Sequence, residues 1–138
     1  MPVDDEDPPY VEPDVELNAL AHAVIGAALE VHKRLGAGLD ESLYRAAMCI
    51  ELRKRGIDFI CEMPVDVLYD GQIIGQRRID LFVGGRLVVE LKAIERLAPV
   101  HKAQVRTYLK ITKTKLGILI NFNVELLKEG IARIVNPI

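Results

Sequence analysis

The stretch RIDLFVGGRLVVELKA, residues Arg78–Ala93, decides the fold. Apolar residues lie on both sides of Gly84-Gly85, which predicts two antiparallel strands, Ile73–Val83 and Leu87–Ala93, joined by a tight turn. The charged residues that interrupt this apolar hairpin are Asp80, Glu90 and Lys92. Their presence raises two interpretations: a solvated sheet face, or a site built on the hairpin.

The length of the turn decides whether the two carboxylates meet. Side chains alternate between the faces of a strand, so Glu90 and Lys92 share a face with Val88. A two-residue turn would put Asp80 and Glu90 on opposite faces of the sheet. A three-residue turn, Gly84–Arg86, would put them directly opposite each other on one face. The site interpretation therefore predicts an odd-length turn or an equivalent bulge.

Two carboxylates facing each other across neighbouring strands would have Cβ atoms about 4.5–5.5 Å apart and would repel each other without a cation. Oxygen ligands without a nearby pair of His or Cys favour Mg²⁺ or Mn²⁺ over zinc. Lys92, two residues beyond Glu90, could then orient a water molecule and neutralise a phosphate oxygen. The alternative, an amphipathic hairpin with a solvated face, remains open on this pattern alone.

The spacing of apolar residues predicts three helices around this hairpin. The first spans Val15–Leu35, with Asp14 as its N-cap and Gly36 at its end. The second is capped by Asp40 and runs to about Arg55. The third begins at Pro99 and runs to about Ile111.

The remaining strands complete an α/β pattern. Short strands are predicted at Phe59–Cys61 and Val65–Tyr69, before the hairpin, and at Gly117–Phe122 and Ile131–Val135, after the third helix. This order of elements favours a mixed sheet flanked by helices over a doubly wound nucleotide-binding fold. The sequence also contains no phosphate-binding glycine motif of the dinucleotide or P-loop kind.

Polar residues on the predicted helices extend the candidate site. Glu41 heads a row of residues on the second helix that packs inward, so its carboxylate must be paired, metal-bound or at the rim of a cleft. It could equally be a first-turn glutamate favoured by the helix dipole. Gln104 and Tyr108 share one side of the third helix with packing residues, and inward polar groups need partners. His32 falls on the buried stripe of the first helix, where we expect a hydrogen-bonded structural histidine.

Composition restricts the class of protein. The chain has 138 residues and 50% hydrophobic residues, enough for one domain with a single core. Residues 1–14 are acidic and proline-rich without Lys or Arg, which predicts a flexible acidic tail and leaves the remainder cationic. Cys49 and Cys61 are expected to be reduced core residues, without a structural zinc. No membrane-length apolar run or secretory signal is found, so we expect a soluble, cytoplasmic protein.

Four short motifs occur in a fixed order along the chain: Gly38-x-x-Glu41-x-x-Tyr44, Ile79-Asp80, Glu90-Leu91-Lys92 and Gln104-x-x-x-Tyr108. Together they resemble the GxxExxY family of the PD-(D/E)XK nuclease superfamily, over roughly Leu17–Val135. The stretches ALEVHKRLGAGLDESLY, VVELKA, PVHKAQVRTYLK and LGILINF carry most of the resemblance. Ile79 stands where the superfamily's name has proline.

The resemblance implies a fold and a set of site residues. The fold is a restriction-endonuclease-like core, a mixed β-sheet flanked by helices with an extra N-terminal helix, over residues 15–138. The implied metal ligands for Mg²⁺ or Mn²⁺ are Asp80, Glu90, the Leu91 carbonyl and, directly or through water, Glu41. Lys92 would position or activate the attacking water, and Gln104 and Tyr108 would hold this lysine or the scissile phosphate. His32 and Tyr44 are candidates for supporting positions only.

The implied activity is that of a metal-dependent nuclease, a phosphodiesterase acting on nucleic acid, with DNA as the expected substrate and a 5′-phosphate product. The alternative is a module on the same fold that binds nucleic acid or protein without catalysis. Few aromatic residues, no Trp and modest basic charge leave no obvious recognition element. Related folds often pair, so a homodimer is expected by analogy alone.

Overall fold

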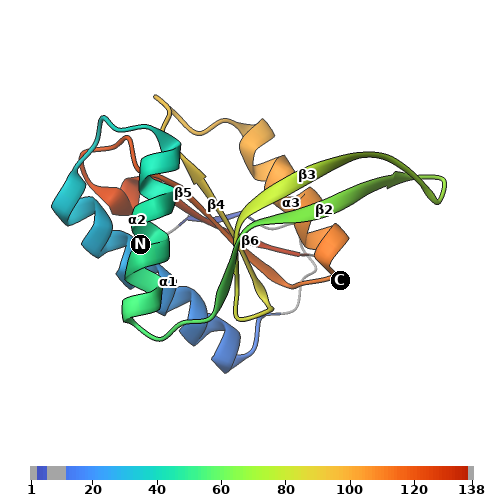
Figure 1. Ribbon diagram of the computed structural model, residues 1–138, viewed down its shortest axis with the longest axis horizontal. Helices are drawn as coiled ribbons and strands as arrows, with labels where there is room; N and C mark the ends of the chain where they lie inside the picture. The colour runs from blue at the N-terminus through green and yellow to red at the C-terminus, as the bar shows by residue number, and fades with distance from the viewer. Residues whose placement is uncertain (1–2, 6–11, 137–138) are drawn as a thin grey trace.

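The computed structural model describes residues 3–5 and 12–136, which form a mixed sheet between two layers of helices (Figure 1). The strand order is β1-β6-β5-β4-β3-β2. The strands are β1 (Val3–Asp5), β2 (Phe59–Tyr69), β3 (Gln72–Val83), β4 (Leu87–Lys92), β5 (Leu116–Asn121) and β6 (Ile131–Val135). Neighbours β4–β5 and β1–β6 are parallel and the other pairs are antiparallel. The predicted α/β class and mixed sheet are confirmed.

The helices begin and end close to the predicted residues. They are α1 (Val15–Leu35), α2 (Glu41–Lys54), α3 (Pro99–Thr112) and the 3₁₀ helix η1 (Leu127–Gly130). Asp14 caps α1, because its Oδ1 accepts a hydrogen bond of 2.8 Å from the N–H of Leu17. Asp40 occupies the N-cap position of α2 but makes no side-chain capping hydrogen bond, so that part of the prediction was wrong.

Alternation along β4 separates two apolar layers. Leu87, Val89 and Leu91 pack in the larger cluster, under α1 and α2, whereas Val88 packs in the smaller cluster, under α3. Glu90 follows Val88 on the face that is covered by α3. The end of β4, which carries Glu90 and Lys92, therefore lies between α2 on one face of the sheet and α3 on the other.

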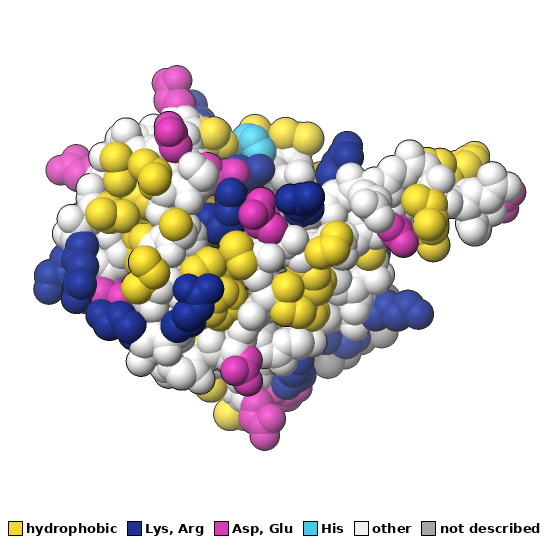
Figure 2. Space-filling view, in the orientation of Figure 1, with side chains coloured by type: hydrophobic (Ala, Val, Ile, Leu, Met, Phe, Trp, Pro, Cys, Tyr) yellow, Lys and Arg dark blue, Asp and Glu magenta, His cyan; other side chains and the backbone are white. Residues whose placement is uncertain are grey.

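Strands β2 and β3 form a long two-stranded ribbon that projects beyond the rest of the sheet (Figure 1). The two short strands predicted before the hairpin are one continuous strand, β2. Within it, Glu62 lies in the left-handed region at φ 51°, and the register with β3 shifts between Val67 and Leu68. Large apolar side chains are exposed near the tip of the ribbon: Leu68, Tyr69, Ile73 and Ile74 (Figure 2).

The acidic N-terminal segment is described only in part. Residues 1–2 and 6–11 lie outside the described residues, so the predicted flexibility of residues 1–14 stays a prediction. Within the described part, the backbone of β1 pairs with β6, Glu12 pairs with Arg133 at 2.7 Å, and Asp14 forms an ion pair with Arg86.

Two further sequence expectations concern the cysteines and the membrane. Both cysteines are free thiols; Cys49 is buried, but Cys61 is exposed on β2, so the expectation that both lie in the core was wrong for Cys61. Among the described residues, none of the helices combines the length and apolar character that a membrane span requires.

Candidate metal site

A three-residue turn joins β3 to β4. Val83 pairs with Leu87, and the N–H of Arg86 donates to the Val83 carbonyl at 3.1 Å. Gly84 and Gly85 both have positive φ, at 59° and 69°, a conformation that other residues adopt only with strain. The predicted odd-length turn is confirmed, and its register aligns Asp80 with Glu90.

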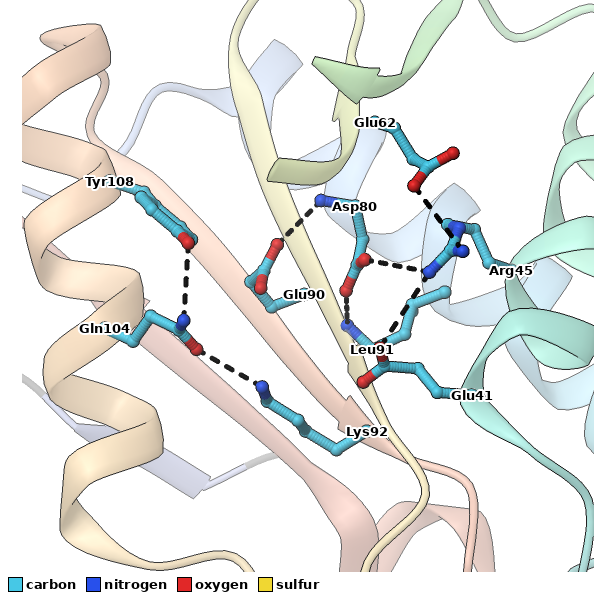
Figure 3. Close-up of polar contacts among 9 residues, drawn as sticks. All are labelled: Glu41, Arg45, Glu62, Asp80, Glu90, Leu91, Lys92, Gln104 and Tyr108. Carbon is cyan, nitrogen blue, oxygen red and sulfur yellow. Dashed lines mark hydrogen bonds and ion pairs between the residues drawn. The ribbon is translucent and has the colours of Figure 1, made fainter. Parts of the chain in front are cut away.

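The side chains of Asp80 and Glu90 accept backbone hydrogen bonds at the point where the pairing of β3 with β4 ends. The last backbone pair in this direction is Leu81 with Val89. Beyond it, the N–H of Asp80 donates to Glu90 Oε2 at 2.7 Å, and the N–H of Leu91 donates to Asp80 Oδ2 at 2.8 Å (Figure 3). The two carboxylates thus lie between β3 and β4, where the strands separate.

Burial makes this carboxylate pair electrostatically costly. Glu90 is only 3% exposed and Asp80 only 9%. Burial, followed by the charge of Asp80, raises the pKa of Glu90 to about 8. Burial also raises the pKa of Asp80 above its ordinary value, against the lowering effect of the Leu91 hydrogen bond. A cation between these groups would relieve both the desolvation and the repulsion.

Lys92 is held on the α3 side of the sheet. Its Nζ donates to Gln104 Oε1 at 3.2 Å, and Gln104 Nε2 donates to the Tyr108 hydroxyl at 3.3 Å (Figure 3). Burial, then the charge of Glu90, raises the pKa of Tyr108. The structure therefore brings the predicted Lys92, Gln104 and Tyr108 together in one chain of hydrogen bonds.

Buried Asn121 fixes the backbone that follows Lys92. Its Oδ1 accepts from the N–H of Ile94 at 3.1 Å, and its Nδ2 donates to the Ile94 carbonyl at 2.9 Å. Asn121 ends β5, the parallel neighbour of β4, and pairs with Lys92 in register. This contact holds the end of β4 in place, a role that the sequence reading did not assign.

Glu41 lies on the other side of the carboxylate pair and reaches it through Arg45. The Arg45 guanidinium is 3.3 Å from Asp80, 3.6 Å from Glu62 and 3.8 Å from Glu41 (Figure 3). Partial burial, then the charge of Asp80, raises the pKa of Glu41. The Glu41 side chain is 41% exposed, at the rim rather than in the core.

Arg45 and Glu62 were missed by the sequence reading. Arg45 follows Glu41 by four residues, a spacing that puts the two side chains on the same side of α2, so a signal for it exists. Glu62 falls between the two short strands that were predicted, and only the continuous β2 brings it beside α2. Acidic and basic side chains gather over this junction of α2 with the ribbon (Figure 2).

Two residues considered for supporting positions, His32 and Tyr44, lie elsewhere. His32 Nε2 is 2.8 Å from the Val124 carbonyl, which confirms the structural histidine. The Tyr44 hydroxyl donates to the Gly36 carbonyl at 2.5 Å and accepts from the N–H of Leu39 at 3.2 Å. Its ring stacks on Phe122 with centroids 4.5 Å apart. Tyr44 therefore holds the loop between α1 and α2 instead of supporting Lys92 or the carboxylates.

The donor set fits a hard divalent cation that is completed by other ligands. In the described part of the chain, no three His, Cys, Asp or Glu side chains converge closely enough to hold a metal alone. Mg²⁺ commonly uses one or two carboxylates together with water and substrate phosphates. Asp80 and Glu90 provide two such carboxylates. Leu91, whose carbonyl is a predicted ligand, contacts Asp80 through its N–H.

Comparison with known proteins adds one finding. A family model described as the PD-(D/E)XK nuclease superfamily matches residues 18–134. Neither the curated proteins nor the solved structures yielded a match.

Proposed function

The chain belongs to the PD-(D/E)XK nuclease superfamily, and we propose that it is a metal-dependent phosphodiesterase that hydrolyses nucleic acid, with DNA as its substrate. We further propose that it is a member of the GxxExxY family, on the strength of Gly38 in the loop before α2 and of Glu41 and Tyr44 in its first turn. Mg²⁺ or Mn²⁺ is the proposed cofactor.

One observation carries the proposal: the Asp80 and Glu90 carboxylates lie buried in the gap between β3 and β4, with Lys92 next to them on β4. Burying two carboxylates side by side is unfavourable, so a sheet with a purely structural role is not expected to contain such a pair. Such a pair is better explained as a binding site than as a solvated face.

In the proposed mechanism, Asp80 and Glu90 would hold the cation, with the Leu91 carbonyl and, directly or through water, Glu41 as further ligands. When bound, the divalent ion stabilises the charge that develops on the scissile phosphate. Lys92 donates hydrogen bonds to the attacking water and to a phosphate oxygen, and Gln104 fixes the position of its Nζ. The water oxygen bonds to phosphorus and gives up a proton to solvent, the bond from phosphorus to the 3′ oxygen breaks, and the leaving 3′ oxygen takes a proton from solvent.

Cleavage of labelled DNA tests this function. The purified chain is incubated with single- and double-stranded DNA in Mg²⁺, in Mn²⁺ and in EDTA. Asp80→Asn, Glu90→Gln and Lys92→Met should each reduce cleavage by at least about 100-fold, the usual effect of removing a group that acts on the transition state. Glu129→Gln and Lys128→Met, at exposed positions of η1, are the matched controls. No cleavage by the wild type, or equal cleavage by Asp80→Asn, would remove the proposal.

The ion pair between Arg45 and Asp80 favours a second candidate, a nucleic-acid-binding module without catalysis. In that case Arg45 is the permanent counter-ion of Asp80, and no metal is needed. Salt-dependent DNA binding without turnover in any divalent ion would support this candidate. The homodimer also stays a prediction, which sedimentation of the purified chain can test.

A further inference from the structure

A cleft of about 290 Å³ lies beside the hydrogen-bonded chain of Lys92, Gln104 and Tyr108. The ribbon of β2 and β3 forms one wall of this cleft, and α3 forms the other. The ribbon and α3 lie beside each other in Figure 1. Its lining residues on the ribbon are Val67, Ile74, Gly75 and Arg77. Those on α3 are Gln104, Thr107 and Tyr108.

The register of the ribbon shows which side chains face α3. Val65 pairs with Arg77 and Val67 pairs with Gly75. Val65 is buried in the cluster that contains Val105 and Tyr108, so these two ribbon pairs share the face toward α3. The ribbon thus carries an apolar residue, a glycine and a cation toward the helix.

Gly75 keeps this cleft open. A Cβ added at Gly75 would meet no atom within 4 Å, and its φ is not in the left-handed region. Backbone conformation therefore does not require glycine at this position. The missing side chain instead leaves space between the ribbon and α3.

The lining combines three chemical properties. Val67 and Ile74 supply apolar contact, Gln104 and Thr107 supply hydrogen-bonding groups, and Arg77 supplies a positive charge. A nucleotide can use all three, because it joins a flat base to an anionic phosphate. The volume is close to the lower limit for sites that hold small organic ligands, which suits one nucleotide and is small for a base pair.

We propose that this cleft binds one unpaired nucleotide of the substrate strand, next to the phosphodiester bond that is cut. The inference rests on the proposed function and narrows its substrate to nucleic acid with a single-stranded portion. Gln104 connects the two regions, because it lines the cleft and accepts the hydrogen bond from Lys92.

Binding measured without hydrolysis tests the cleft. Fluorescence anisotropy in EDTA compares a labelled single-stranded DNA with a blunt duplex of the same sequence, each with the full chain. The wild type should bind the single strand more tightly than the duplex. Gly75→Val places a side chain in the cleft and should weaken single-strand binding by about tenfold, the effect of losing one base contact, with little change for the duplex.

Matched variants control for changes in the ribbon itself. Gln72→Val introduces a valine at an exposed position of the ribbon outside the cleft, and this variant should bind DNA like the wild type. Arg77→Gln should weaken single-strand binding. It should also reduce the slope of log affinity against log salt concentration by about 1, the effect of losing one phosphate contact. Arg78→Gln, at the neighbouring exposed arginine that does not line the cleft, should do neither.

The outcomes separate this proposal from the proposed function. If Gly75→Val and Arg77→Gln both bind single-stranded DNA like the wild type, the proposal that the cleft binds a nucleotide is overturned. This holds even if DNA is cut in an Asp80-dependent way. Selective loss of single-strand binding in these variants supports the cleft, even if no DNA is cut. Equal weakening of single-strand and duplex binding by Gly75→Val also overturns the proposal, because a general contact would then explain the effect.

Discussion

The backbone N–H of Asp80 donates a 2.7 Å hydrogen bond to the Glu90 carboxylate, where a strand would ordinarily bond to the backbone of its neighbour. This contact holds one acid against the backbone of the other, where the backbone pairing of β3 with β4 ends. It also explains why two carboxylates stay together in the folded protein: the backbone groups around them are donors.

The stability of the metal-free protein should depend on pH in a direction set by this pair. Burial raises the pKa of Glu90 from its ordinary value of 4.5 to about 8. Between these pH values the folded protein holds a proton that the unfolded chain releases, so stability falls as the pH rises. The melting temperature in EDTA should therefore decrease from pH 5 to pH 8.

Glu90→Gln provides the comparison for this pH dependence. The variant keeps the shape of the side chain but does not titrate, so its melting temperature should vary less over the same range. Some slope should remain, because burial also raises the pKa of Asp80. A wild-type melting temperature that rises relative to that of Glu90→Gln between pH 5 and pH 8 would contradict this assignment.

Arg45 should act as a substitute cation when no metal is bound. Its guanidinium lies 3.3 Å from Asp80, and both side chains are largely buried, at 19% and 12% exposure. Arg45→Met should lower the stability of the metal-free protein by about 2 kcal/mol, below the effect in a fully buried pair. Mn²⁺ should then stabilise the variant more than the wild type in a thermal melt. Equal stabilisation of the two proteins by Mn²⁺ would show that Arg45 and the cation do not compete.

Gln104 should control the position of Lys92 and not the binding of metal. Gln104→Leu removes the acceptor that lies 3.2 Å from Lys92 Nζ, while the Asp80 and Glu90 carboxylates keep their own contacts. We expect a decrease in cleavage rate of about tenfold or more and an unchanged affinity for Mn²⁺, measured by calorimetry. A weakened Mn²⁺ affinity would instead place Gln104 among the groups that support the cation.

Tyr44 should matter for stability alone. Its hydroxyl contacts the backbone of Gly36 and Leu39, so Tyr44→Phe leaves two backbone groups without this partner. The expected loss is about 1–2 kcal/mol in urea unfolding, with normal cleavage by the folded variant. A large fall in cleavage at unchanged stability would return Tyr44 to the list of site residues.

Local patterns in the sequence predict much of this structure. The apolar stripes, the cap at Asp14 and the first-turn proline Pro99 locate α1 and α3 to within a residue or two, because these signals act within one element. The two glycines of the turn are compatible with the register that aligns Asp80 with Glu90. Alternation alone then assigns Lys92 to the face covered by α3.

The parts that could not be predicted depend on contacts between distant elements. Arg45 becomes important only because β2 brings Glu62, and β3 brings Asp80, to the same side of α2. The cleft beside Tyr108 depends on how the ribbon leaves the sheet, which no local pattern encodes. The strand Val3–Asp5 depends on pairing with β6, at the other end of the chain.

The central claim is that Asp80 and Glu90 together hold a divalent cation, and titration of Mn²⁺ into the metal-free protein at pH 8 tests it most directly. We predict one saturable site in the wild type and in Glu129→Gln, and a loss of affinity of at least tenfold in both Asp80→Asn and Glu90→Gln. Equal Mn²⁺ binding by all four proteins, or no binding by the wild type, would contradict the claim.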